Sequence, residues 1–216
     1  MSWSSLAADL AAGTTTTLAV SLAGIAIGLV LGLVLALLRV ARIPIAARLI
    51  VAYVSLMRAT PMVTLALLIF FGIPSLGFTL SPLVAGIITL SLNTSAFQAE
   101  IWRAAILDFP RGQLDAARAV GMTPTTAFRR IVFPQIWRAS LPALVNEFTL
   151  IVKASPAVAV IGGVDLTRVA VRVTSATYEP LRPFLSATLI YIAIVMCLIM
   201  MQRLIESAVV KRYGIL

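Results

Sequence analysis

Long apolar runs alternate along the chain with short segments that are polar and mostly basic. Residues 11–38 carry no charge, and a bilayer crossing needs roughly 20 apolar residues, so this run predicts one spanning helix with some tilt. Residues 59–99 are also uncharged but too long for one crossing, and the Gly- and Pro-containing stretch 72–77 divides them. The pattern therefore predicts an all-α, polytopic membrane protein with five transmembrane helices, near residues 11–38, 49–71, 82–103, 140–162 and 183–202.

Composition and charge agree with a membrane protein. Apolar residues make up 61% of the 216 residues, which excludes an ordinary soluble domain. The net charge of +9 would suit a nucleic-acid binder, but the basic residues flank the apolar runs, as membrane topology requires. An external N-terminus places twelve Lys and Arg residues in the cytoplasm and three outside, in a charged segment at 163–182. The positive-inside tendency therefore predicts an external N-terminus and a cytoplasmic C-terminus.

Three glycines recur at every fourth residue of the first predicted helix: Gly24, Gly28 and Gly32. Small residues at this spacing let another helix approach closely, so they predict a packing seam within the subunit or at a dimer interface. The alternative is that glycine is merely tolerated in a lipid-facing helix.

The stretch from Gly112 to Pro134 is the one long polar, basic segment within this apolar chain. Gly121 suits the left-handed stop of a helix begun near Gly112, and Thr123 and Pro124 suit the N-cap and first residue of a second helix. Pro134 is expected to end that helix, so the stretch is predicted to be a helix-turn-helix. Three arginines are left to face water or a partner: Arg118, Arg129 and Arg130.

The same stretch resembles the cytoplasmic EAA loop of the permease subunits of ATP-binding cassette (ABC) importers. The resemblance is carried by Asp115-Ala116-Ala117, then Gly121, then Ile131 and Pro134, with Asp115 where the family has Glu. Four further segments resemble the polar amino acid branch of that family, the histidine, glutamine and arginine type. They cover nearly the whole chain in order: 58–61, 92–103, 141–147 and 160–162.

This resemblance implies a type I importer permease, a single transmembrane domain over residues 1–216 whose coupling loop spans about 103–138. It implies a multi-pass protein of the bacterial inner membrane that forms the translocation path for an amino acid and binds no nucleic acid. Its partners would be two ABC ATPase subunits, a second identical or homologous permease, and an external solute-binding protein. The residues implied to couple it to the ATPase are Asp115, Ala116, Ala117, Arg118, Gly121, Ile131 and Pro134.

The sequence offers no evident residues for catalysis or for a metal. It contains no histidine, one cysteine and no Gly-x-x-x-x-Gly-Lys-Ser/Thr loop to hold the phosphates of ATP. Cys197 lies in the last apolar run and is expected to pack as a small core residue. The chain is therefore not predicted to be an enzyme or to bind a cofactor, and ATP and Mg²⁺ are expected on its partner subunits.

Two segments share the pattern cation, Ala, hydroxyl, Pro: residues 58–61 (Arg-Ala-Thr-Pro) and 153–156 (Lys-Ala-Ser-Pro). Proline begins a helix well but cannot continue one without losing a hydrogen bond, so each pattern predicts a broken membrane helix with Thr60 or Ser155 as N-cap. The N-terminus of such a half-helix carries partial positive charge, and the cation adds to it, which suits the α-carboxylate of a substrate. The alternative is a proline kink whose cation reaches the interface or pairs with a carboxylate.

Polar side chains on other helices complete the predicted path. A carboxylate within the membrane needs a partner, so Glu147 is expected to pair with another helix or with Arg58. Asn93 is expected to bond between helices or to line the path, and Glu100 to pair locally with Arg103. The candidate path residues are Arg58, Thr60, Pro61, Asn93, Glu147, Lys153 and Ser155. The family usually has Asp where Ala154 stands and Gln near Leu65, so no particular amino acid is predicted.

Two other functions fit the bare pattern. A secondary transporter or channel component would use the same broken helices, but it would not explain a long basic helix-turn-helix loop. A membrane-anchored DNA-binding protein would use that loop, although the loop lacks a third supporting helix. Co-elution of an ATPase with the chain separates the first of these from an importer.

Overall fold

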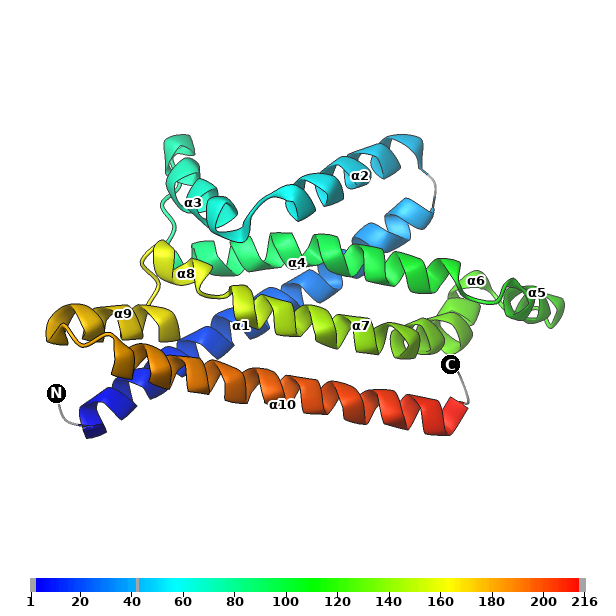
Figure 1. The fold of residues 1–216 in the computed structure, drawn as a ribbon. Helices are drawn as coiled ribbons and strands as arrows, with labels where there is room; N and C mark the ends of the chain where they lie inside the picture. The colour runs from blue at the N-terminus through cyan, green and yellow to red at the C-terminus, as the bar shows by residue number, and fades with distance from the viewer. Residues whose placement is uncertain (1–2, 42, 214–216) are drawn as a thin grey trace.

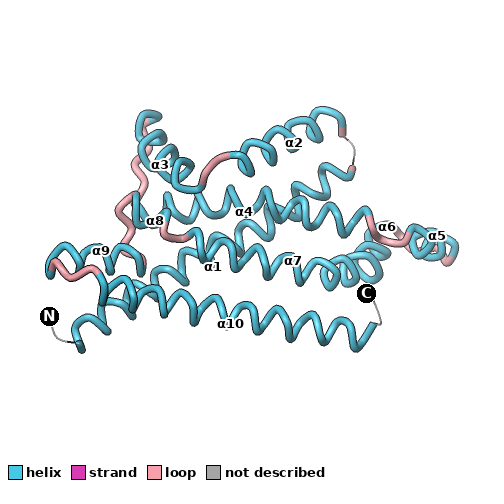
Figure 2. Tube along the Cα trace, in the orientation of Figure 1, coloured by secondary structure: helices cyan, strands magenta, loops and turns pink. Residues whose placement is uncertain are grey.

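The computed structural model describes residues 3–41 and 43–213, which form helices joined by short turns (Figures 1 and 2). Arg42, in the predicted basic turn, lies outside the described residues. The elements in chain order are α1 (Trp3–Val40), α2 (Pro44–Ala59), α3 (Met62–Gly72), the 3₁₀ turn η1 (Ile73–Leu76), α4 (Pro82–Leu107), α5 (Arg111–Ala119), α6 (Pro124–Ala127), the π-helical segment η2 (Phe128–Val132), α7 (Phe133–Ala154), α8 (Ala157–Val160), α9 (Leu166–Thr177) and α10 (Leu181–Tyr213).

Four long helices, α1, α4, α7 and α10, form the body of the bundle, and α2 and α3 form a V above α4 (Figure 1). The most extensive helix contact is between α1 and α4, and α4 also contacts α2, α3 and α7. Helix α10 lies against α7, and α9 contacts both α10 and α1. Helix α4 is therefore the central helix of the bundle.

Three described segments have the length and composition of a membrane crossing: Ser5–Val40, Pro124–Val160 and Leu181–Ser207. The pair Pro44–Ala59 and Met62–Leu76 makes a fourth if these two helices, bent by 109°, count as one crossing. Helix α4 has 26 residues but is more polar, and twelve of them are buried, so protein rather than lipid covers its polar side chains. The five predicted crossings correspond to these helices, and the count of five stays a prediction.

Two predicted helix starts are wrong. Helix α2 begins at Pro44 rather than near residue 49, because Pro44 serves as its first residue. The span predicted to begin near residue 140 starts at Pro124 instead, because α6, η2 and α7 follow one another as one continuous segment. Pro142 lies inside α7 rather than at its start.

Pro134 was expected to end the second helix of the loop, and this prediction is also wrong. The N–H of Phe133 bonds to the carbonyl of Phe128, five residues back, so the backbone is in the wider π register just before the proline. Pro134 is then the second residue of α7, directly after this π-helical turn. The local change to the π register accommodates Pro134, and the helical segment continues past it along α7.

The glycines at every fourth residue of α1 face α4 of the same chain. A Cβ added at Gly24 or Gly32 would lie 2.8 Å from a side-chain carbon of α4. At Gly28 the nearest atom would be Cγ2 of Thr94, at 2.3 Å. Glycine is therefore required for the close approach of the two helices, which confirms the packing seam and places it within the subunit.

Gly28→Ala is expected to destabilise the chain by about 1–3 kcal/mol, because the added methyl group overpacks this seam. Thr94 is β-branched and cannot turn its own methyl group aside without cost. The apparent melting temperature of the purified protein in detergent measures the effect. Adding Thr94→Ser, which removes the opposing methyl group, should restore most of the lost stability.

Gly72→Ala is the matched control for this prediction, since a Cβ at Gly72 would have no neighbour closer than 3.6 Å. It should leave the melting temperature nearly unchanged. An equal loss in both variants would contradict the assignment of Gly28 to the seam.

Helix α10 exposes most of its apolar surface. Only 6% of the residues in its apolar window are buried, and Cys197 is exposed, so the prediction that Cys197 packs in the core is wrong. The sequence could not show this, because a helix that is apolar on every side carries no signal for which side packs.

Candidate functional site

The predicted coupling loop contains a short helix, α5, that lies beyond the end of the bundle (Figure 1). This helix ends in a Schellman turn, in which the N–H of Gly121 bonds to the carbonyl of Arg118 and the N–H of Met122 to that of Ala117. Gly121 has φ +75°, in the left-handed region that this turn requires. The predicted stop at Gly121 is confirmed.

The start of the second helix is also as predicted. The hydroxyl of Thr123 accepts a hydrogen bond from the N–H of Thr126, and Pro124 is the first helical residue. One side-chain bond then crosses from α5 to α7, where Gln135 Nε2 donates to Gln113 Oε1 at 2.7 Å. The capped turn and the hydrogen bond between Gln135 and Gln113 thus hold α5 in place relative to the helical segment that follows it.

Most of the predicted coupling residues on α5 are exposed. Arg118 Nη1 lies 3.2 Å from Asp115 Oδ1, and both side chains are more than two-thirds exposed. Ala116 is exposed, Ala117 is buried, and the apolar side chain of Val120 is 77% exposed. An ion pair beside a free apolar side chain on a projecting helix suits a protein partner. Three further residues of the loop lie closer to the bundle or on its surface: Ile131 and Pro134 are half-buried, and Arg129 is exposed.

A cavity of about 710 Å³ lies between the end of α4, the first half of α7 and the start of α5. Its polar lining comes from Glu100, Asp108, Gln113, Gln135 and Ser140, and its remaining lining is apolar. Among residues 3–41 and 43–213, no three His, Cys, Asp or Glu side chains lie together in a way that could hold a metal ion. The cavity leaves space beneath α5 without providing a metal site.

The predicted break at Pro61 is present, and the two helices that meet there are bent by 109°. Pro61 has no N–H, so the carbonyl of Met57, four residues earlier, loses its helical donor. Asn93 Nδ2 of α4 donates to this carbonyl at 3.0 Å. The interhelical bond predicted for Asn93 therefore satisfies the acceptor that the proline leaves open, as a membrane interior demands.

Thr60 is not the N-cap that the pattern predicted. Its hydroxyl donates back to the carbonyl of Leu56 at 2.7 Å, and the residue ends α2 rather than starting α3. Pro61 takes the N-cap position of α3, which has no side-chain cap. The prediction failed because a helical threonine can satisfy a carbonyl of its own preceding turn.

The second pattern gives a milder interruption than predicted. Helix α7 ends at Ala154 and α8 has four residues, while 124–160 still qualifies as one crossing. Ser155 is not an N-cap, because its hydroxyl donates at 2.9 Å to the carbonyl of Val152, the acceptor that Pro156 leaves open. A half-helix N-terminus is therefore not formed here.

Polar contacts connect one stretch of α4 to both α2 and α7. The Thr94 hydroxyl donates to Glu147 Oε1 at 3.1 Å, and Gln98 Nε2 donates to Thr94 Oγ1 at 2.9 Å. Glu147 is 5% exposed, and the partner on another helix that was predicted for it is the hydroxyl of Thr94. The Arg58 guanidinium carbon lies 5.2 Å from the ring centre of Phe97 on α4.

Ser155 belongs to a different polar cluster. Its hydroxyl lies 3.5 Å from Tyr191 Oη of α10, which is also 3.1 Å from Thr167 Oγ1 and 3.4 Å from Asp165 Oδ2. This cluster joins the end of α7 to α9 and α10. Lys153, also predicted for the path, is exposed.

Sequence reasoning did not predict which residues make these contacts with the path residues. Thr94 and Gln98 are four residues apart on one helix, and this spacing was the available signal that they share a face. Nothing in the sequence linked Phe97 to Arg58 or Tyr191 to Ser155, because each pair comes from separate helices.

Glu100 forms the local pair expected of it and a second one. Its Oε2 lies 2.9 Å from Arg103 Nη2, which confirms the predicted pair, and its Oε1 is bound by Arg39 of α1. The Glu100 carboxylate of α4 thus joins α4 to α1 through Arg39, while Arg103 binds it from the next turn of the same helix.

The structure is a helical membrane bundle with a broken helix, a buried polar contact at that break and a capped helix beyond one end, an arrangement that suits a membrane transport subunit. Residues 24–211 match the family described as the binding-protein-dependent transport system inner membrane component, and the chain belongs to this family. Permeases of this family work with ATPase and solute-binding partners. The family agrees with the importer resemblance and does not support the secondary-transporter and DNA-binding alternatives.

Individual relatives agree with this family. The chain is 36% identical over 195 residues to the nopaline transport system permease protein of Agrobacterium fabrum, covering 86% of this chain and 81% of that one. It is 37% identical over 155 residues to the arginine transport system permease protein of Bacillus subtilis, covering 71% of each. The crystal structure of an amino acid ABC transporter with histidines matches with a TM-score of 0.85 at 34% identity, over 94% of both chains. The two relatives are transport system permease proteins and the matching structure is of an amino acid ABC transporter, and this chain is likewise an integral membrane transport subunit rather than an enzyme.

Proposed function

We propose that this chain is the permease subunit of an ATP-driven importer for polar amino acids or close analogues. It crosses the bacterial inner membrane five times, with its N-terminus outside and its C-terminus in the cytoplasm. It forms the translocation path with a second permease, identical or homologous. Two ATPase subunits hold ATP and Mg²⁺, a solute-binding protein delivers the substrate from outside, and this chain holds no cofactor itself.

The observation that carries the proposal is the projecting helix α5 with its Gly121 cap. Helix α10 ends on the same side of the bundle as α5, and α1 begins on the opposite side (Figure 1). The positive-inside tendency places the α5 side in the cytoplasm, within reach of an ATPase. The exposed side chains of Asp115, Ala116 and Arg118 form the proposed docking face.

The base of the loop is proposed to pass the movement of the ATPase into the membrane. Ile131 and Pro134 lie in the segment that runs without interruption from α6 through η2 into α7. A displacement of α5 therefore reaches Glu147 along one continuous helical segment, which supports a direct mechanical link.

The substrate path is proposed to pass the stretch of α4 that contacts both α2 and α7. Arg58 would attract the α-carboxylate of the substrate, and Glu147 its amino group, so that the two ends of a zwitterion meet opposite charges. Asn93 fixes the bend beside Arg58, and Thr60, Pro61, Lys153 and Ser155 are proposed to flank the path at the two proline sites. Arg58 is exposed in the single chain, so the second permease would complete the path on its side. Glu147 is buried against α4, so it would meet the substrate only when α4 and α7 move apart.

The test is purification and reconstitution of the whole transporter. The tagged chain, isolated from its own membrane in mild detergent, should bring an ABC ATPase with it. Proteoliposomes that contain this complex should accumulate a labelled polar amino acid when ATP and the solute-binding protein are supplied, and not when ATP is withheld. Uptake by the chain alone, without an ATPase, would contradict the proposal.

A further inference from the structure

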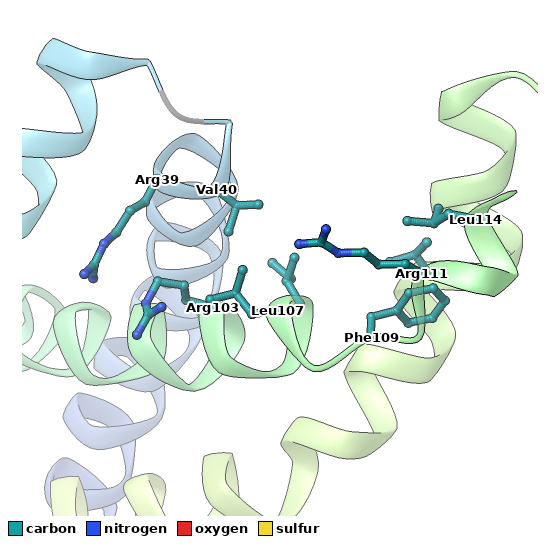
Figure 3. A pocket seen from close by; sticks show the side chains of 9 residues that line it. Arg39, Val40, Arg103, Leu107, Phe109, Arg111 and Leu114 are labelled. Carbon is teal, nitrogen blue, oxygen red and sulfur yellow. The ribbon is translucent and has the colours of Figure 1, made fainter.

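A basic pocket lies where the last turns of α1 and α4 approach the start of α5 (Figure 3). Its volume is about 430 Å³. Three arginines line it, each from a different helix: Arg39 from α1, Arg103 from α4 and Arg111 from α5. The rest of the lining is apolar and includes Val40 and Leu107. The pocket therefore combines positive charge with hydrocarbon walls.

The positive charge in this pocket is only partly neutralised. Arg39 and Arg103 share the single carboxylate of Glu100. Arg111 extends from the first turn of α5 toward Val40 (Figure 3), and no carboxylate of the described chain lies within ion-pair distance of it. Asp108, its near neighbour in sequence, lines the adjoining cavity instead. Three arginines against one carboxylate leave two positive charges in excess.

The position of the pocket specifies the kind of anion. The pocket lies at the ends of α1 and α4, and in the orientation given under the proposed function these ends lie at the cytoplasmic boundary of the bilayer, where lipid headgroups meet the hydrocarbon region. Guanidinium groups bind phosphate oxygens through paired N–H donors, and apolar walls suit the first carbons of acyl chains. Basic pockets between membrane helices on the cytoplasmic side bind anionic lipid headgroups.

We propose that this pocket binds the phosphate headgroup of an anionic phospholipid, with Arg111 as its principal contact. Arg111 is the first residue of α5, so a bound lipid ties the loop helix to the ends of α1 and α4. The site lies apart from the substrate path, and it depends on the membrane-spanning fold rather than on which solute is imported.

The test measures lipid binding to the complete transporter, purified with its ATPase subunits. Phosphatidylglycerol is titrated into the detergent-solubilised complex, and bound lipid is counted by native mass spectrometry. Arg111→Gln should weaken phosphatidylglycerol binding by roughly fivefold, the contribution of one arginine at a membrane surface. Phosphatidylethanolamine should bind more weakly than phosphatidylglycerol to the wild type, and inorganic phosphate at the same concentration should not displace the lipid.

Arg48→Gln is the matched control. Arg48 is an exposed arginine of α2, in the same basic turn region but outside the pocket lining, and its loss should leave lipid binding unchanged. If Arg111→Gln does not assemble, Arg111→Lys keeps the charge but loses the paired donors of the guanidinium, so it should bind phosphatidylglycerol more weakly than the wild type, and unchanged binding by a well-assembled Arg111→Lys would overturn the role of the guanidinium.

Five other results would overturn the proposal. Unchanged binding by Arg111→Gln, or equal weakening by Arg48→Gln, would show that the pocket is not the site. Equal binding of phosphatidylethanolamine would remove the role of anionic charge. Displacement by inorganic phosphate would make this a site for free anions. Lipid binding that appears only after the ATPase subunits are removed would show that an acidic side chain of a protein partner fills the pocket. None of these outcomes bears on ATP-driven uptake, so the proposed function is tested separately.

Discussion

Gly121→Val is expected to lower ATP-driven uptake by roughly tenfold while the transporter still assembles. Gly121 has φ +75°, where an ordinary residue loses about 1–2 kcal/mol and a β-branched residue fits worst. The Schellman turn at the end of α5 would then open, and the angle between α5 and the following helix would no longer be fixed. ATP hydrolysis would continue without moving α7. Proteoliposomes in which amino acid accumulation and phosphate release are measured together would report this uncoupling.

Gly112→Val is the matched control for this experiment. Gly112 lies in the same helix, has no positive φ, and a Cβ there would meet no atom within 4 Å. The same increase in bulk should therefore leave coupled uptake nearly intact. Gly121→Asn, a residue that tolerates the left-handed conformation, should recover much of the activity. Normal coupled uptake by Gly121→Val would contradict the role assigned to the turn.

Glu147→Gln is expected to reduce uptake by a similar factor, roughly tenfold, with little change in stability. The amide keeps the size of the side chain and an oxygen that can accept the hydrogen bond from Thr94, but it loses the negative charge. If the carboxylate attracts the amino group of the substrate, loss of the charge removes that attraction directly. Initial uptake rates over a range of substrate concentrations, with melting temperatures of the same preparations, would separate transport from folding.

Thr94→Val supplies the complementary change for Glu147. It removes the hydrogen bond but leaves the carboxylate, so it should lower stability by about 1 kcal/mol or more and affect uptake less than Glu147→Gln. Wild-type uptake by Glu147→Gln would show that the buried carboxylate serves structure alone.

The sequence predicted those parts of the fold that depend on local chemistry. The left-handed stop at Gly121 and the N-cap at Thr123 follow from the conformational preferences of single residues. The seam at Gly28 follows from a helical repeat of small residues. The continuity of residues 124–160 could not be predicted in this way, because Pro134 ends a helix only if the backbone before it keeps the α register. The π-helical segment η2 lies just before Pro134, so the backbone does not keep the α register there and the helical segment does not end.

The sequence predicted which types of residue form the candidate site, but it did not predict which hydrogen bonds they make. The two proline patterns correctly indicated positions where helical carbonyls lose their donors. The compensating donors differ, however, since one is Ser155 in the same turn and the other is Asn93 on a separate helix. Likewise, Glu147 needed a buried partner, but only the packing of α4 against α7 identifies Thr94. Pairings between helices depend on how the helices meet, which a single sequence does not contain.

The bond from Asn93 to the carbonyl of Met57 makes the bend between α2 and α3 depend on a third helix. Helix α4 runs unbroken from Pro82 to Leu107 and leads directly into the segment before α5. A helix is stiff along its axis, so a displacement of α4 at Leu107 is expected to move Asn93 by nearly the same amount. We therefore expect a movement of α4 to change the angle between α2 and α3.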